Sequence, residues 1–305
     1  MEPTDDEYDD DPTLAPTSMT TMSCAMDNAK HMYTLLASLL LGRKKDQLVR
    51  VDIDASGLYF TAHSKGKSLQ IKTSMSSDLF ETFQYLEAEA TSFRICVNHV
   101  LDGLGVFGAS AMASTAVTCS YSAQEGVFSM VLTDDGVLAE CSIKTMVDDE
   151  HNDCSLGVFE RSFESAKVLG HMILASNALH DACSEFHELP HGAAVELVLH
   201  PTSFSSTGTS QADDAMCFRM QANTPTSSCE MELHKDSTAI VQVQVEATIA
   251  ASFQWTLLQA GLQVLPVASE SFLRLNAQGF CSIQHMLLLG SHRAFVDVLL
   301  CPDAA

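Results

Sequence analysis

The sequence predicts an α+β protein made of two tandem domains that share one order of elements. Each half reads as strand, helix, strand, turn, strand, and each half also contains a strand, a helix and a hairpin. The period of this repetition is far longer than that of solenoid repeats, so it indicates duplicated domains. With 305 residues, 46% of them hydrophobic, the chain is long enough to fill two cores.

The first half opens with an amphipathic helix that starts at Asp27. Its apolar residues recur with the 3.6-residue period of a buried helical face. These residues are Met32, Leu35, Leu36, Leu39 and Leu40. Two strands follow at 48–53 and 58–62, and the turn between them contains Gly57.

Residues 91–145 hold the second unit of the first half. A strand at 93–97 precedes a helix that Asn98 can cap, because a side-chain oxygen at this position accepts a free backbone N–H. Val100, Leu101, Leu104 and Phe107 lie on one face of that helix. Alternating strands come next, and Asp134-Asp135-Gly136 forms the turn of a hairpin.

The second half repeats both units. A strand at 167–174 leads to a helix that Ser176 caps, and a strand follows at 195–199. The buried face of this helix consists of Leu179, Ala182, Cys183 and Phe186. A strand at 240–246, a helix at about 247–262 and a hairpin complete the half. The face of that helix contains Ile249, Phe253 and Leu257, and the hairpin strands are 272–275 and 280–287.

Several segments resemble the Rad-one subunit family of the nine-one-one complex, a heterotrimeric DNA-damage checkpoint clamp related to PCNA. The segments are SFRICVNHVLDGLGVFGAS at 92–110, GVLAECSIKT at 136–145, SNALHDACSEFHEL at 176–189, GFCSIQHML at 279–287 and CPD at 301–303. A looser match is MDNAKHMYTLLASL at 26–39. The resemblance is collinear over nearly the whole chain, from about residue 22 to residue 303.

The resemblance implies two PCNA-like clamp domains with antiparallel sheets outside and four helices lining the pore side. The expected pore helices are 27–41, 98–107, 176–189 and 247–260. The expected divisions are an acidic tail at 1–22, a first clamp domain at 23–145, a connector at 146–155 and a second clamp domain at 156–305.

The function that the resemblance implies is that of a non-catalytic subunit in a nuclear, heterotrimeric sliding clamp. The ring would encircle double-stranded DNA at damage sites and serve as a platform for checkpoint and repair proteins. Its partners would be two other PCNA-like subunits and a clamp loader, with no cofactor, metal or membrane. Two alternatives stay open: a 3′–5′ exonuclease, and a homotrimeric replication processivity clamp.

The ring would close through edge strands, because pairing removes exposed sheet edges. One edge is expected at 137–145 and the other near 216–222. The interface residues on these edges are Val137, Ala139, Cys141, Ile143, Cys217 and Arg219. Partner peptides would bind beside the connector, at Met146, Val147 and Asp148.

The resemblance also assigns a side of the helices to DNA. The candidate DNA-facing residues are Lys30, His31, Thr34, Arg43, Lys44, Lys45, His180 and Ser184. Ordinary solvated charge is the alternative for the lysines and Arg43. Ser252 and Gln254 stand where the family usually has basic residues. This departure indicates that strong DNA contact belongs to the partner subunits.

Composition limits the other classes of function. The net charge is −23 with only 16 Lys and Arg, which argues against autonomous DNA binding, because phosphate affinity comes from cations. The acidic tail reads as disordered, with docking to a partner as the alternative. The longest apolar run is too short to span a bilayer. The ten cysteines are scattered, which favours reduced structural thiols over a disulfide framework.

Three short motifs match patterns of nucleotide-binding or metal-binding sites, but their sequence context does not fit such sites. GLGVFG at 103–108 matches a dinucleotide fingerprint, but its glycines lie within or after a helix rather than directly after a strand. HELPH at 187–191 matches a zinc-protease motif, yet Pro190 indicates that the helix is ending there. DIDASG at 52–57 begins like a calcium loop, but His63 stands where a bidentate Glu is required. Carboxylate pairs such as Asp134-Asp135 fall in expected turns.

Overall fold

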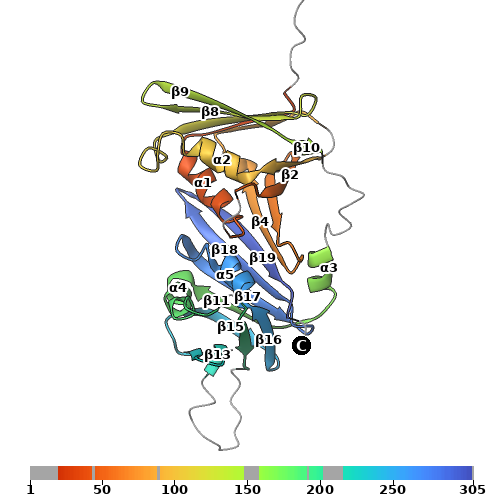
Figure 1. Cartoon of the computed structure of the whole chain (residues 1–305), viewed down its shortest axis with the longest axis vertical. Coiled ribbons are helices and arrows are strands. Elements are labelled where there is room, and N and C mark those ends of the chain that lie inside the picture. Colours follow the sequence, from red (N-terminus) through yellow and green to blue (C-terminus); the bar gives the residue numbers. More distant parts are fainter. Residues whose placement is uncertain are drawn as a thin grey trace, which may run out of the picture.

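The computed structural model describes residues 20–42, 45–87, 90–147, 158–190, 192–201 and 216–303. It shows an elongated molecule with two lobes (Figure 1). The elements of the first half are β1 (Met22–Met26), α1 (Ala29–Ala37), β2 (Leu48–Asp54), β3 (Gly57–His63), β4 (Leu69–Ser76), β5 (Thr82–Tyr85), β6 (Thr91–Cys96), α2 (Val97–Leu104), β7 (Ala116–Ser122), β8 (Val127–Asp134) and β9 (Val137–Lys144). A 3-10 turn at Ser77–Leu79 follows β4.

Two short elements lie between the halves, β10 (Met146–Val147) and α3 (Val158–Glu164). The elements of the second half are β11 (Val168–Ala175), α4 (Ser176–Ser184), β12 (Ala194–Leu199), β13 (Met216–Asn223), β14 (Ser228–His234), β15 (Ile240–Val245), β16 (Ile249–Gln254), α5 (Trp255–Leu262), β17 (Ala268–Asn276), β18 (Cys281–Leu289) and β19 (His292–Leu300).

The strands form three antiparallel sheets. The first has the order β5-β1-β7-β8-β9, and the smallest has the order β14-β13-β12-β16. The ten-stranded sheet runs β10-β6-β2-β3-β4-β19-β18-β17-β11-β15 and contains strands from both halves. The α+β prediction with antiparallel sheets is therefore confirmed.

The two halves have the same pairing diagram. β1 pairs with β5 and β7 in the first half, as β11 pairs with β15 and β17 in the second. The series β7-β8-β9 matches β17-β18-β19, and β6-β2-β3-β4 matches β16-β12-β13-β14. Helices α1 and α2 occupy the same places in this order as α4 and α5. The duplicated order of elements expected from the sequence is present in three dimensions.

The halves are joined where β4 pairs with β19. Six residue pairs run from Phe295 opposite Ser74 to Leu300 opposite Leu69. On this junction Thr73, Ile71, Val296 and Val298 are fully buried. The apolar row at the junction is continuous with the cores of both halves, which form one cluster of buried residues. Pairing and burial therefore both stabilise the join between the halves.

Four helices cover the same side of the sheets. Ser38, just after α1, contacts Thr73 of β4 with 3.0 Å between their hydroxyl oxygens. A Cβ on Gly261 of α5 would meet Val298 of β19 at 2.8 Å, so α5 lies directly on the junction. From the second half, the Gln263 side-chain amide donates to the carbonyl oxygens of Ser38 and Leu40. Helix α3 lies across the sheet on the opposite face, beside Gln70 (Figure 1).

The expected helices were too long, and one was partly wrong. Residues 249–254 form strand β16, and α5 begins only at Trp255. The spacing of Ile249 and Phe253 fits a helical face and a strand face equally well, because a four-residue interval suits both periods. These residues form a strand because they pair with β12 along their whole length. Ser252 and Gln254 consequently lie before the helix, not on its DNA-facing side.

Neither expected capping residue is an N-cap: Ser176 is the first residue of α4, whose N-cap is Ala175, and Asn98 lies inside α2. The N-cap of α2 is Cys96, and the Asn98 side chain instead accepts a hydrogen bond from the Gln47 backbone at 2.9 Å. The N-cap of α1 is Asn28, whose side chain accepts from the Lys30 N–H at 3.1 Å. Helix α2 begins earlier than expected, because strand β6 ends at Cys96 and not at Val97.

Candidate assembly edges and helical face

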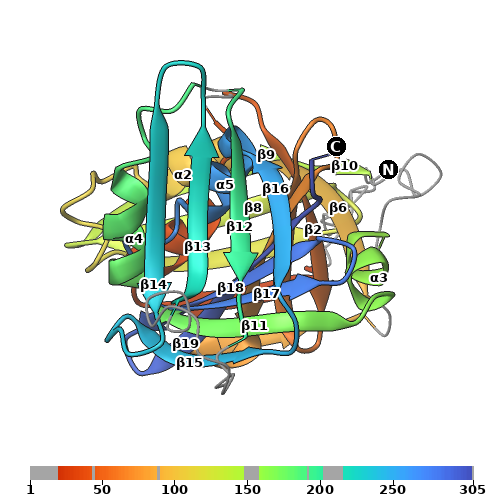
Figure 2. The same cartoon turned by 90° about the horizontal axis from the view of Figure 1, so that it is seen from below.

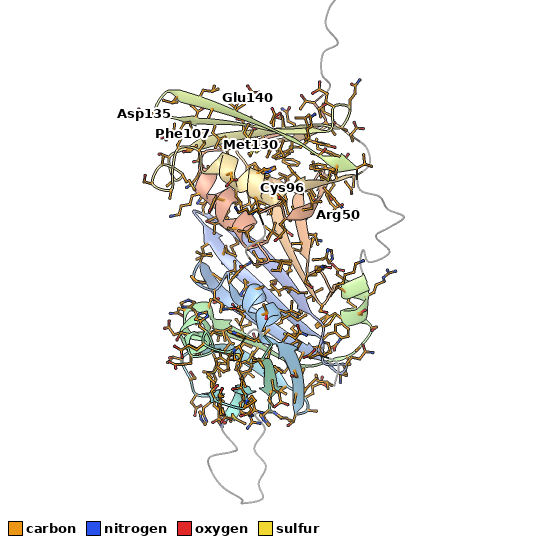
Figure 3. The ribbon with its side chains drawn as sticks, in the orientation of Figure 1. Arg50, Cys96, Phe107, Met130, Asp135 and Glu140 are labelled. Atoms are coloured by element: carbon orange, nitrogen blue, oxygen red, sulfur yellow. The ribbon has the colours of Figure 1, made fainter. Side chains whose placement is uncertain are left out.

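Strand β9 forms one outer margin of the first sheet. Across the described ranges it pairs with β8 alone, so its other side carries backbone groups that lack a strand partner. Side chains alternate along it. Those of Ala139, Cys141 and Ile143 point inward and are half-buried or buried, whereas the opposite row, Leu138, Glu140, Ser142 and Lys144, is exposed. Figure 3 shows Glu140 on the outer strand, with Asp135 at the hairpin turn.

The hairpin turn fixes which backbone groups face this open side. Asp135 and Gly136 have φ angles of 45° and 78°, as in a two-residue type I′ turn. In such a turn the Val137 N–H donates to the Asp134 carbonyl, and hydrogen-bonded positions then alternate along the strand. The N–H groups of Glu140 and Ser142 therefore point away from β8, toward the open edge.

Four of the predicted edge residues lie on this strand. Val137 is 57% exposed, whereas Ile143 is only 6% exposed. Because Ala139, Cys141 and Ile143 face inward, their part in an interface would come from apolar packing and not from solvent-facing contacts. The solvent-facing row was missed in the sequence, because alternation does not tell which row faces the core until the neighbouring helix is placed.

The second predicted edge is wrong by one strand. Cys217 and Arg219 lie on β13, which is paired with β12 on one side and β14 on the other. The outer strand is β14, as Figure 2 shows. Cys217 is fully buried, which is the physical reason: β13 has the more apolar inward row and therefore takes the inner place. The exposed residues of β14 are Ser228, Glu230, Glu232 and His234.

Helix α2 holds β9 in position. A Cβ on Gly103 would lie 2.6 Å from the Met130 methyl and 3.2 Å from the Cys141 sulfur, so the helix approaches the sheet closely there. Gly103 lies inside α2, and Gly105 is its C-cap. The glycines of GLGVFG therefore serve helix packing and helix termination, and they do not open a helix toward a phosphate.

The helical side carries few cations. Lys30 and Lys45 are exposed, Thr34 is half-buried, and burial lowers the pKa of His31. His180 and Ser184 lie on α4, with Ser184 exposed. Arg43 and Lys44 fall outside the described residues. These placements are compatible with a DNA-facing role, which stays a prediction.

One further cation borders this side. Lys65, in the loop between β3 and β4, lines a pocket of about 690 Å³ together with Leu41 and residues of α5 and its C-terminal end, including Gln259 and Gln263. No local pattern indicates this cation, because the loop is distant from both helices along the chain and only folding brings them together.

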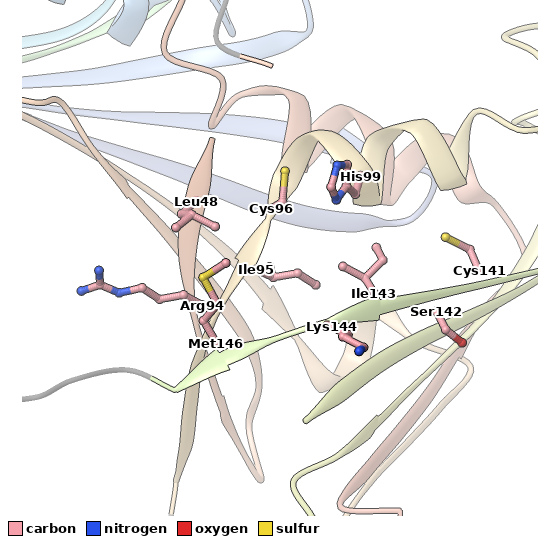
Figure 4. A pocket seen from close by; sticks show the side chains of 10 residues that line it. All are labelled: Leu48, Arg94, Ile95, Cys96, His99, Cys141, Ser142, Ile143, Lys144 and Met146. Carbon is pink, nitrogen blue, oxygen red and sulfur yellow. The ribbon is translucent and has the colours of Figure 1, made fainter. Parts of the chain in front are cut away.

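The start of the connector continues the ten-stranded sheet. Met146 pairs with Arg94 and Val147 with Phe93, and both connector residues are exposed, at 53% and 87%. Met146 lines an open pocket of about 410 Å³ together with residues of β6, α2 and β9 (Figure 4). Asp148 lies outside the described residues. The expectation of a peptide site beside the connector remains a prediction.

The chemical motifs are not assembled as their functions require. Helix α4 ends at Ser184, so His187 follows the helix instead of lying on it. The Asp54 side chain accepts from the Ser56 backbone at 2.7 Å, which is a turn contact. Asp134 and Asp135 belong to the hairpin turn of β8 and β9.

One group in the described chain could hold a cation. The ligand atoms of Asp46, Cys96 and His99 lie within 4.8 Å of one another. The side chains of Asp46 and His99 are 85% and 58% exposed. We assign no metal to this group, since exposed side chains of these types often approach one another without an ion. No helix in the described chain is long and apolar enough to cross a bilayer.

Comparison with protein families gives a match over most of the chain. The family described as "Repair protein Rad1/Rec1/Rad17" matches residues 21–287. Similar proteins include the "Cell cycle checkpoint protein RAD1" of Mus musculus and of Homo sapiens. Each is 23% identical over 282 residues, which cover 92% of this chain and 91% or 90% of the relative. The "DNA damage checkpoint control protein rad1" of Schizosaccharomyces pombe is 22% identical over 275 residues, which cover 83% of this chain and 78% of the relative.

Solved structures of DNA clamps have the same fold. The chain superposes on a PCNA2–PCNA3 complex from Sulfolobus tokodaii with a TM-score of 0.69 at 10% identity. It superposes on PCNA from Thermococcus kodakaraensis with a TM-score of 0.68 at 12% identity. In both cases 93% of this chain and 100% of the other chain are covered. The PCNA-like fold predicted from the sequence is confirmed.

Proposed function

The chain belongs to the Rad1/Rec1/Rad17 family of repair proteins, and from this premise we propose that it is a non-catalytic subunit of a heterotrimeric sliding clamp. The ring encircles double-stranded DNA at damage sites in the nucleus. It serves there as a platform for checkpoint signalling and repair enzymes, after a clamp loader has placed it. The family and the clamp fold support a DNA clamp role in the checkpoint.

One observation carries the proposal. The halves of this chain are joined by pairing β4 with β19, and the strands that correspond to these two in the repeated diagram are β14 and β9. Those two strands are the outer margins of their sheets. The molecule therefore presents, at its two ends, the complementary halves of the junction that it has already formed internally.

Such an arrangement favours ring formation. Pairing of β9 of one subunit with β14 of the next joins the subunits head to tail. Head-to-tail association produces a closed ring when the rotations between neighbouring subunits add up to a full turn. Pairing of the edges also removes open strands that would otherwise promote aggregation. The four helices, all on one side of the sheets, would line the pore. Six domains from three subunits would complete the circle.

The sparse positive charge of the helical side agrees with a topological mechanism. Helices α1, α2, α4 and α5 contain a single Lys and no Arg. A protein that holds DNA by electrostatics needs many phosphate contacts, whereas an encircling ring needs few. Retention on DNA would therefore depend on ring closure, and partner subunits would supply most contacts.

The test is retention on circular and linear DNA. Rings are assembled from this chain and two further clamp-fold chains, and a clamp loader places them on DNA. They should remain on closed circular DNA at high salt. They should leave when the circle is cut, because a ring slides off a free end. Salt-sensitive loss from both DNA forms alike would contradict the proposal.

The exonuclease alternative has its own assay. Degradation of DNA by the purified chain, dependent on a divalent metal and lost on replacement of a carboxylate, would support it. We expect no metal-dependent degradation, since Asp134 and Asp135 are turn residues at the end of a hairpin instead of converging core carboxylates.

A further inference from the structure

The pairing of β19 with β4 inside the chain is a guide to how the free edges would pair, because β9 corresponds to β19 and β14 corresponds to β4. Its inward row is apolar, with Val298 opposite Ile71. On its outward row Asp297 lies opposite Lys72. Burial raises the pKa of Asp297, and the charge of Lys72 is among the influences that oppose this rise. Opposite charges across the strands thus accompany the apolar row at this junction.

The hairpin turns allow the same register to be placed on the free edges. Val137 follows the turn of β8 and β9 as His292 follows the turn of β18 and β19, so Glu140 takes the place of Phe295. Ser228 follows the turn of β13 and β14 as Gln70 follows the turn of β3 and β4. Glu232 therefore takes the place of Ser74. Because Phe295 lies opposite Ser74, two copies of this chain would bring Glu140 opposite Glu232.

Side-chain direction supports this register. Glu140 and Glu232 are both exposed on the outward row, whereas Cys141 and Met231, which would be the next pair, are both half-buried and inward-facing. A slip of one residue would place inward side chains opposite outward ones, which the pleat does not allow. A slip of two residues in one direction would place Glu140 opposite Glu230 instead.

Two glutamates placed opposite each other would repel, and the residues around Glu140 and Glu232 do not neutralise this repulsion. Within its own sheet Glu140 lies opposite Val131, which is uncharged. Glu232 lies opposite Arg219 of β13, but Arg219 forms an ion pair with Glu230 at 3.6 Å. Arg219 is therefore already paired with another carboxylate of β14. Like charges directly opposite across strands destabilise a pair.

We propose that the outward rows of β9 and β14 prevent this chain from closing a ring with itself and select clamp-fold partners with Lys or Arg opposite Glu140 and Glu232. The inward rows of both strands are apolar and carry no charge, so the charged outward rows decide between partners. This inference rests on the proposed function, since it assumes that these edges form the ring. It names the chemistry that the partner edges must carry.

The experiment measures self-association of charge-reversed variants by sedimentation equilibrium. Glu140→Lys places a lysine opposite Glu232, so we expect self-association to become about fivefold or more stronger than in the parent at low salt. The gain should shrink at high salt, because exposed charges are then screened. The double variant E140K/E232K places lysine opposite lysine and should return to the behaviour of the parent.

The control variant is Glu125→Lys, an exposed residue in the turn between β7 and β8. It changes the net charge by the same amount at a position outside the edge strands β9 and β14, so it should not alter self-association. An equal gain in Glu125→Lys and Glu140→Lys would overturn the inference, because general charge reduction would then explain both. Trimerisation of the parent chain alone at low salt would overturn it as well.

The outcome separates this inference from the clamp function. If the parent joins two other clamp-fold chains while Glu140→Lys gains no self-association, the edge selection is wrong and the clamp function stands. If the parent associates with no clamp-fold chain, the proposed function itself fails, and the inference fails with it.

Discussion

The hydroxyl oxygen of Ser271 lies 2.8 Å from Nδ1 of His285, deep between the long sheet and α5. Nε2 of the same ring lies 3.1 Å from the Gly261 carbonyl, which can only accept, so Nε2 carries the proton and Nδ1 accepts from Ser271. The hydroxyl of Ser176 lies 2.7 Å from that of Ser271. A buried polar chain thus ties α4 and α5 to the sheet. Because His285 is fully buried, this serine–histidine contact has no access to a substrate.

The first prediction concerns acid stability. Burial lowers the pKa of His285 from 6.5 to about 4, so between these values the ring is neutral when folded and protonated when unfolded. The unfolded state then binds more protons, and the free energy of unfolding falls as pH drops from 6.5 toward 4. The loss from this group is about 3 kcal/mol, and it is absent above pH 6.5.

Urea unfolding across this pH range, with His285→Gln beside the parent, checks the prediction. The variant should be less stable near neutral pH but should lose less stability on acidification. Parallel pH profiles for the two proteins would show that His285 does not titrate as described.

The second prediction concerns the turn between β2 and β3. Gly57 has a φ of 150°, and a Cβ there would lie 2.2 Å from the Met75 carbonyl oxygen. Gly57→Ala should therefore lower the free energy of unfolding by about 2 kcal/mol or more. Gly66→Ala is the matched control, since Gly66 has only the Ser68 hydroxyl at 3.8 Å and should tolerate alanine. Equal stability of both variants in thermal unfolding would contradict the packing.

The third prediction concerns the open side of β9. The Ser142 N–H points away from β8, so Ser142→Pro should leave the hairpin intact and remove a donor from the edge. We expect the variant to stay folded by circular dichroism and to lose association with clamp-fold partners in size-exclusion chromatography. Unchanged association would mean that the ring closes elsewhere. Serine-to-proline replacement at Ser122, on the interior strand β7, should instead destabilise the fold itself.

The fourth prediction concerns DNA contact by the assembled ring. A lysine that neutralises one phosphate displaces about one counterion, so Lys30→Ala and Lys45→Ala should each reduce the slope of DNA affinity against salt by about one. Lys167→Ala removes the same charge from an ion pair with Glu246, so it should leave that slope unchanged. If all three variants behave alike in a salt titration of DNA binding, the helical side does not touch phosphate.

The sequence predicted secondary structure best where the apolar residues follow a single period, either helical or extended. The stripe of α1 and the Asp-Gly turn at 135–136 were identifiable because helical spacing and turn chemistry act within a few residues. Prediction failed at Ile249 and Phe253, whose spacing suits both a helix and a strand. It failed again at the second edge, because β13 and β14 both alternate, and only their packing order shows which strand is outermost.

The sequence by itself determined the duplicated order of elements, the acidic charge and the resemblance that led to the clamp fold, because these depend on local periods and on collinear residues. Tertiary structure decided that the halves join through β4 and β19 and that β14, not β13, is the second edge. These relations link strands that are distant along the chain. Pairing across a sheet is settled by the burial of whole faces, which no local pattern contains.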